Sequence, residues 1–331
     1  MKVKSPHISM PSKRWLVLSL SACVAIALAG PRIKVDTRIQ SFNLPEDLDG
    51  YLKARESRYP DITPGTEKKI FWHQQQKDIR PYALVYLHGF SATRQEISPL
   101  PEQVAETLGA HLFATRFTGH GRSGEAMAEA SVNAWLNDGA EALEIGRRLG
   151  RKTIVIAVST GATAALYLAK QARFREQIAA VVLLSPNLGL PDPKAGILSW
   201  PWGQQVAEGI LGPERSWQPR NAAEARYWTH RYPTRALLPM IGLVELTRSQ
   251  DFRTYRIPTL MVYSPNDQVI SVPKMQTVFK QMAAQPKELM AFTQSADSEQ
   301  HILAGDILSP QSTSPLKHLI LEFLQKQVLS P

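Results

Sequence analysis

The sequence predicts an α/β protein with a mostly parallel, doubly wound sheet and a helical cap insertion. Three observations lead to this prediction. Short apolar runs alternate along the chain with helix-length segments, the pattern of a parallel sheet covered by helices. Several of these runs are continuously apolar, as expected for strands buried on both faces. A tryptophan-rich stretch at residues 187–256 interrupts the alternation.

The composition is that of a folded globular protein. The chain has 331 residues, of which 44% are hydrophobic and 20% charged. Lys2, Lys4, Lys13 and Arg14 precede any acidic residue, and removing these four charges from the net +9 leaves +5. No basic stripe interleaved with aromatic residues follows them. A nucleic-acid partner is therefore not expected.

Residues 1–30 are typical of a signal peptide or of a membrane or lipid anchor. A basic stretch to Arg14 precedes an apolar run at residues 15–29, which fits an export signal and is shorter than the roughly 20 residues that span a bilayer. "LSAC", ending at Cys23, is similar to a lipobox, and "ALAG" offers cleavage after Ala29. Cys23 is the only cysteine, so no intramolecular disulfide can form.

Four alternatives stay open for this segment. Cys23 is a candidate lipidation site, or an ordinary small residue in an apolar run. Cleavage after Ala29 and retention as an uncleaved anchor are the others. With lipidation, cleavage or an uncleaved anchor, we expect the folded part to lie in the periplasm or at a membrane face.

The remaining chain divides by pattern. Residues 31–67 are expected to form a tether and the start of the fold, and residues 68–186 and 257–331 the α/β core. A helix is predicted over residues 132–149, where apolar side chains recur on one face. The predicted strands lie near residues 69–74, 82–88, 111–117, 153–158, 179–185, 259–264 and 288–292.

Residues 187–256 are predicted to form the cap, without a convincing strand. Four of the seven tryptophans fall in this stretch: Trp200, Trp202, Trp217 and Trp228. Ligands of open α/β sheets bind at the carboxyl ends of the strands, which such an insertion would cover. An aromatic cap implies a substrate with an apolar acyl group. The alternative is a packing subdomain with its own small core.

A candidate nucleophile lies in "AVSTGA", residues 157–162, where a predicted strand turns into a helix. The hydroxyl of Ser159 needs a base and a group that orients the base. Asp267 follows a later predicted strand and His301 follows the last one. This gives the order serine, acid, histidine, which is one of the chain orders in which three such residues act together. Asp297 and Glu299 are the competing acids, but they lie next to His301 in sequence rather than at the end of the preceding strand.

Two backbone amides are the candidate oxyanion hole. "LHGFSAT" follows a predicted strand, and the turn at Gly89 would present the N–H of Phe90. The N–H of Thr160, next to Ser159, would be the second donor. His120, in the glycine-rich turn "RFTGHGRSG", is expected to have a structural role.

Together, "LHGF", "GHGRSG", "AVSTGA", "SPNDQVI" and "EQH" resemble the α/β-hydrolase fold superfamily, in its branch of serine carboxylesterases and monoacylglycerol lipases. The resemblance covers residues 68–328. It implies Ser159 as nucleophile, Asp267 as orienting acid, His301 as base, and the Phe90 and Thr160 amides as oxyanion donors. The chain departs from the usual pattern at Ala157 and Ala162, where the elbow usually has glycine, and at the start of "RFTGHG".

The resulting expectation is an exported or membrane-associated serine hydrolase that cleaves carboxylic esters through an acyl-enzyme. The sequence has no metal or dinucleotide motif, so no cofactor is expected. The expected partner is a small-molecule ester, with a membrane contact through the N-terminal segment. The alternatives are a thioesterase, amidase or lactonase with the same three residues, and a catalytically silent binding protein of the same fold.

Overall fold

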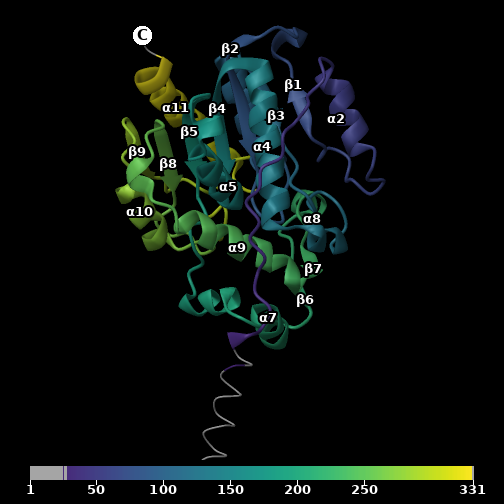
Figure 1. Cartoon of the computed structure of the whole chain (residues 1–331). Helices are drawn as coiled ribbons and strands as arrows, with labels where there is room; N and C mark the ends of the chain where they lie inside the picture. The colour runs from purple at the N-terminus through teal and green to yellow at the C-terminus, as the bar shows by residue number, and fades with distance from the viewer. Residues whose placement is uncertain (1–24, 26–27, 330–331) are drawn as a thin grey trace, which may run out of the picture.

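The centre of the molecule is a seven-stranded sheet (Figure 1). Its strands are β1 (Lys69–Phe71), β2 (Arg80–Leu87), β3 (His111–Ala114), β4 (Gly150–Val158), β5 (Ile178–Leu184), β8 (Thr259–Tyr263) and β9 (Lys287–Ala291). The spatial order is β1-β3-β2-β4-β5-β8-β9, and only β1 is antiparallel to its neighbour. This computed structural model describes residues 25 and 28–329. It confirms the α/β class and the mostly parallel sheet.

Helices cover both faces of the sheet. One layer contains α4 (Val132–Leu149), α5 (Ser159–Ala169) and α10 (Val272–Gln281), and the other contains α3 (Leu100–Thr107) and α11 (Pro310–Leu324). Alternate residues of β2 enter different cores: Val85 and Leu87 pack in the first layer, Leu84 and Tyr86 in the second. Shorter helices are α2 (Leu48–Glu56) and α6 (Ala172–Arg175), and the chain continues from α11 into a π-helical turn, Gln325–Leu329.

The local sequence explains the central helix and strand. The Ser131 hydroxyl accepts a hydrogen bond from the Ala134 N–H and caps α4, whose bounds are those predicted. Strand β4 is apolar from Ile154 onward because β2 and β5 flank it and helices cover both of its faces. The residue that follows β4 therefore lies at the middle of the sheet's carboxyl edge, where α/β proteins bind ligands.

The insertion at residues 187–256, which we call the cap, contains a second, two-stranded sheet. Its elements are α7 (Gly203–Leu211), β6 (Glu214–Ser216), α8 (Ala222–Tyr227), β7 (Arg231–Pro233) and α9 (Leu237–Arg248). Strands β6 and β7 pair in antiparallel fashion, so the expectation of no strand here is wrong. Each strand has three residues, and those of β6 are all exposed, so neither shows an apolar pattern. Helix α9 packs on α5, and its Leu243 and Val244 join the main core.

Residues 30–44, which we call the strap, run along the α4 face from the cap toward α2 (Figure 1). At the cap end the Trp202 N–H donates to the Pro31 carbonyl oxygen at 2.8 Å. Farther along, the Asn133 side chain donates to the Arg38 carbonyl oxygen at 2.9 Å, and the Gln40 N–H donates to the Asn137 side chain at 2.8 Å. The strap thus joins the cap to the core.

Cys23 and its neighbours lie outside the described residues. Within residues 25 and 28–329, no helix is both long and apolar enough to cross a membrane.

Candidate functional site

Ser159 occupies the turn between β4 and α5, with the left-handed backbone angle φ 51°. A non-glycine residue in this region is strained, and such strain is concentrated at functional sites. The turn is tight because a Cβ on Gly161 would overlap the carbonyl oxygens of Leu87 and His88. The Ser159 side chain reaches a cavity while the residue as a whole is 6% exposed.

The structure brings Asp267 and His301 together. His301 Nδ1 lies 2.8 Å from Asp267 Oδ2, while Asp267 Oδ1 accepts hydrogen bonds from the Val269 and Ile270 N–H groups at 2.8 and 3.1 Å. Burial disfavours the charged imidazole, but the hydrogen bond and charge of Asp267 outweigh it, and the pKa of His301 is raised. Because Nδ1 faces Asp267, Nε2 is the nitrogen left for proton transfer.

Asp297 binds the backbone of the histidine loop and not the imidazole. Its Oδ2 accepts hydrogen bonds from the His301 and Ile302 N–H groups at 3.0 and 2.8 Å. Its Oδ1 forms an ion pair with Arg220 of the cap, which also pairs with Glu224 at 2.7 Å. Glu299 is more than half exposed. The geometry therefore pairs the imidazole with Asp267 rather than with either competing acid.

The two expected oxyanion donors line the same cavity as Ser159. Thr160 is the second residue of α5, where N–H groups have no intrahelical acceptor. The Phe90 N–H belongs to the planar peptide whose carbonyl oxygen, on Gly89, lies 2.8 Å from His88 Nδ1. Holding this carbonyl fixes the direction of the Phe90 N–H. Burial lowers the pKa of His88 to about 4, so the ring is neutral at pH 7.

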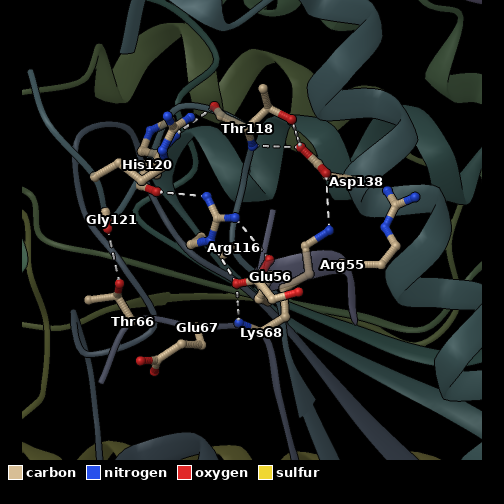
Figure 2. A network of polar contacts seen from close by, with 12 residues as sticks. Arg55, Glu56, Thr66, Glu67, Lys68, Arg116, Thr118, His120, Gly121 and Asp138 are labelled. Carbon is tan, nitrogen blue, oxygen red and sulfur yellow. Dashed lines mark hydrogen bonds and ion pairs between the residues drawn. The ribbon is translucent and has the colours of Figure 1, made fainter. Parts of the chain in front are cut away.

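A buried polar network fixes the glycine-rich turn that follows β3 (Figure 2). Arg116 pairs with Glu56 of α2 through two 2.8 Å contacts and donates to the His120 carbonyl oxygen at 3.0 Å. Asp138 of α4 accepts from the N–H and hydroxyl of Thr118 and from Lys68. Ion pairs of this kind, once buried, hold a segment because breaking one leaves an uncompensated charge.

The backbone of His120 is held by this network, and its side chain packs among aromatic rings. Its ring centroid lies 5.0 Å from that of His88, 5.5 Å from Trp135 and 5.9 Å from Phe90. Burial and the neighbouring His88 hold the pKa of His120 well below its usual range. A neutral imidazole therefore supports the back of the Phe90 loop.

The cavity has a volume of about 790 Å³ and a mixed lining. Its aliphatic lining includes side chains from the cap: Leu190, Ala195, Leu198, Ala207, Ile210, Leu211, Leu237, Met240 and Ile241. Its polar lining includes Gln218, Arg220 and Glu224 of the cap and Asp297, Ser298 and Glu299 of the histidine loop. The aliphatic side chains suit a hydrocarbon chain, and the polar side chains suit a hydrogen-bonding group.

In the part of the chain that the structure describes, no group of three histidine, cysteine, aspartate or glutamate side chains is placed to hold a metal ion.

Sequence reasoning missed three residues of this site: His88, Glu96 and Arg220. Glu96 is 2% exposed, lines the cavity and accepts a hydrogen bond from the Gly89 N–H at 2.9 Å. The available signal was a carboxylate in the loop after "LHGF", seven residues beyond Gly89. Arg220 carries no comparable signal because its partner Asp297 lies 77 positions away.

Solved structures of low sequence identity share this fold. A structure reported with the metagenome-derived lipolytic enzymes LipS and LipT has 19% identity and a TM-score of 0.65, and covers 80% of this chain and 100% of its own. Monoacylglycerol lipase of Paleococcus ferrophilus has 17% identity and a TM-score of 0.57, covering 78% and 99%. Monoglyceride lipase of Saccharomyces cerevisiae has 13% identity and a TM-score of 0.59, covering 80% and 92%.

Comparison at the level of families is more specific than these structural similarities. No curated protein matches the chain. A family model described as serine aminopeptidase, S33, matches residues 80–296, which contain β2, the β4–α5 turn, the cap and Asp267. With this match, the parallel sheet and the strained serine turn, the chain belongs to the S33 serine aminopeptidase family of α/β hydrolases.

Proposed function

We propose that the protein is a serine hydrolase that cleaves carboxylic esters with an apolar acyl group. One observation carries the proposal: the strained Ser159 shares a cavity with the hydrogen-bonded pair of His301 and Asp267. A serine hydroxyl becomes nucleophilic when a positioned base accepts its proton. This pairing supports nucleophilic catalysis more directly than the fold does, because the same fold hosts many activities.

In the proposed reaction, Ser159 Oγ attacks the ester carbonyl carbon while His301 Nε2 accepts the hydroxyl proton. The N–H groups of Phe90 and Thr160 stabilise the negative charge on the carbonyl oxygen. His301 then gives its proton to the leaving alcohol, which departs as the acyl-enzyme forms. Water, deprotonated by His301, attacks the acyl group, and His301 returns this proton to Ser159 Oγ as the bond to the acyl group breaks and the carboxylic acid product leaves.

The mixed lining of the cavity supports a substrate class. The leaving alcohol receives its proton from His301, whose loop contributes Asp297, Ser298 and Glu299 to the lining, whereas the aliphatic side chains of the cap suit an acyl chain. Monoesters of a hydroxyl-bearing alcohol combine these features. The structural similarity to lipases and to monoacylglycerol lipases from two organisms agrees with this class.

Labelling with a fluorophosphonate probe tests the serine mechanism. We expect the folded wild-type protein to be labelled and Ser159→Ala to remain unlabelled. Equal labelling of the two proteins would show that another residue reacts. A folded wild type that is not labelled would favour the alternative of a catalytically silent binding protein.

A panel of substrates tests the reaction class. Rates on p-nitrophenyl esters from acetate to palmitate, compared with those on matched thioesters, anilides and lactones, would separate esterase from thioesterase, amidase and lactonase activity.

We further propose that residues 1–30 export the protein or hold it at a membrane. The basic and apolar pattern of this segment supports the proposal. The strap that follows begins at the cap, where Trp200 is 65% and Ile210 75% exposed, and exposed apolar side chains of this size suit a membrane interface. Mass spectrometry of the mature protein distinguishes a lipidated Cys23, a start at Gly30 and an intact Met1.

A further inference from the structure

Glu96 is a buried carboxyl group at the reaction centre that the mechanism above does not use. It lies in the loop between β2 and α3, and its Oε2 accepts hydrogen bonds from the Gly89 N–H at 2.9 Å and the Tyr86 hydroxyl at 3.0 Å. A Cβ built on Gly89 would lie 2.6 Å from Glu96 Oε1 and 3.2 Å from Ser159 Cβ. The second carboxyl oxygen is therefore a close neighbour of the nucleophile.

The first oxygen of Glu96 fixes the oxyanion loop. The peptide before Gly89 is held by its N–H on Glu96, and the peptide after Gly89 is held by its carbonyl oxygen on His88. With both peptide planes fixed, the Phe90 N–H has one direction. Glu96 and His88 thus position the Phe90 N–H, and neither residue donates to the oxyanion itself.

The second oxygen has a different environment. Glu96 lines the same cavity as Ser159 and His301. The ionisable groups that act on Glu96 are Tyr86, on β2, and His301, on the loop after β9, whose pKa the charge of Glu96 helps to raise. Negative charge on Glu96, which shares the cavity with His301, favours the imidazolium form of His301.

We propose that Glu96 is a positioning residue of the reaction, whose one oxygen orients the Phe90 amide and whose other oxygen stabilises the imidazolium of His301 during acyl transfer. This inference rests on the proposed serine mechanism. Burial raises the pKa of Glu96 to about 7, although Gly89, Tyr86 and His301 act in the opposite direction. The charge on Glu96 consequently changes near neutral pH, jointly with that of His301.

The variant Glu96→Gln separates the two roles. The glutamine oxygen can still accept from Gly89 and Tyr86, so the loop stays in place while the charge is removed. We expect kcat for a soluble p-nitrophenyl ester to fall about tenfold, with KM unchanged within about twofold. A tenfold fall corresponds to a change of about one unit in the pKa of His301, that is, in the preference for its charged over its neutral form. The acid limb of kcat/KM should move to lower pH, because His301 loses a charge that raises its pKa.

Glu96→Ala removes both roles and should lower kcat by about 100-fold or more, the effect of losing an oxyanion donor. Tyr86→Phe is a second test that keeps the carboxyl group, and should shift the pH profile because Glu96 loses one donor. Glu102→Gln is the matched control. Glu102 is partly buried and also has a raised pKa, but it accepts a hydrogen bond from Ser98 and does not line the cavity that holds Ser159. Its kinetics should match those of wild type.

The outcomes separate this inference from the proposed function. If fluorophosphonate labels wild type and Glu96→Gln shows the shifted limb and reduced kcat, Glu96 has the proposed role. If the wild type is labelled and active but Glu96→Gln, Tyr86→Phe and Glu96→Ala all behave like Glu102→Gln, the role of Glu96 is refuted while the serine mechanism stands. If the folded wild type is neither labelled nor active, the proposed function itself fails.

Discussion

The backbone at Ser159 depends on the size of the residues around it. Gly161 is the residue of the turn with no room for a side chain, because the carbonyl oxygens of Leu87 and His88 occupy the position of a Cβ. Ala157 is completely buried at the end of β4, and its methyl group is accommodated there. Of positions 157 and 161, the sequence therefore replaces the usual glycine at position 157, where a methyl group fits, and keeps it at position 161, where a methyl group does not fit.

Two substitutions test this difference. Gly161→Ala should lower kcat by about 100-fold or more, since the added methyl group displaces the turn and misplaces Ser159. Ala157→Gly should leave activity within about tenfold. Both are measured with a p-nitrophenyl ester, with circular dichroism as a control for folding. Wild-type kcat in Gly161→Ala, or complete loss in a folded Ala157→Gly, would show that the turn is built in another way.

The raised pKa of His301 predicts the pH dependence of catalysis. The base must be neutral to accept the Ser159 proton, so activity is lost as pH falls through the pKa of His301. Because Asp267 raises that pKa, kcat/KM should reach half of its maximum at a pH above 6.5, the ordinary pKa of histidine. In Asp267→Asn we expect the limb to move to lower pH and kcat to fall by about 10³- to 10⁴-fold. A limb at or below 6.5 in wild type would contradict the ion pair.

Sequence reasoning proposed Ser159, Asp267 and His301 because each follows a strand, and parallel strands bring their carboxyl ends to one edge. It did not propose Glu96, because its importance comes from a hydrogen bond to Gly89 and from the closeness of Ser159. Neither contact leaves a periodic pattern in the chain. The role of Asp297 was missed for a similar reason, since its carboxylate accepts hydrogen bonds from backbone N–H groups.

Between elements, an ion pair joins the cap to the histidine loop. Arg220 precedes α8 and is held between Glu224 and Asp297, which are both buried. Asp297 in turn binds the N–H groups of His301 and Ile302. The cap is thereby connected to His301, the proposed base, through one carboxylate.

Arg220→Met should lower kcat about tenfold and the free energy of unfolding by about 2 kcal/mol or more, because two buried carboxylates lose their counter-charge. Arg220→Lys should recover part of both losses, since lysine restores the charge but not the guanidinium fork. The matched control is Arg231→Met, whose pair with Glu214 is exposed and contributes little. Equal free energies of unfolding and equal kcat values for Arg220→Met and Arg231→Met would rule out a link from the cap to His301 through Arg220.

The predictability of the elements follows from their burial. The long apolar strands and α4 were predicted within a few residues because their burial imposes a pattern. The β6–β7 pair was not predicted, since its strands are three residues long and are defined by pairing with each other. The membership of α9 in the main core depends on its packing against α5, a contact between segments that are distant in sequence.

At the scale of the whole molecule, the strap is the connection between the N-terminus, the core and the cap. It crosses α9 at Gly242, where a Cβ would lie 2.7 Å from Ile33 Cγ2 and 3.0 Å from Val132 Cγ2. Gly209 on α7 has nothing within 4 Å of the same position. The two helical glycines form a natural comparison.

Gly242→Ala should push the strap away from α9 and speed tryptic cleavage after Arg32, Lys34 or Arg38. Gly209→Ala should leave that cleavage unchanged and stabilise α7 by about 0.5–1 kcal/mol through its higher helix propensity. Limited proteolysis followed by mass spectrometry gives the cleavage rates. Equal rates for the two variants would mean that the strap is not held at Gly242.

The contact between Pro31 and Trp202 also constrains the order of folding. The strap is synthesised before the core, whereas the helix on which it rests at Gly242 is made about 200 residues later. Contacts of such long sequence separation form late, because a large loop must close first. The cap, which lines the cavity, is consequently attached to the strap only after the central strands exist, and a complete cavity becomes a sign that the core and the cap have both folded.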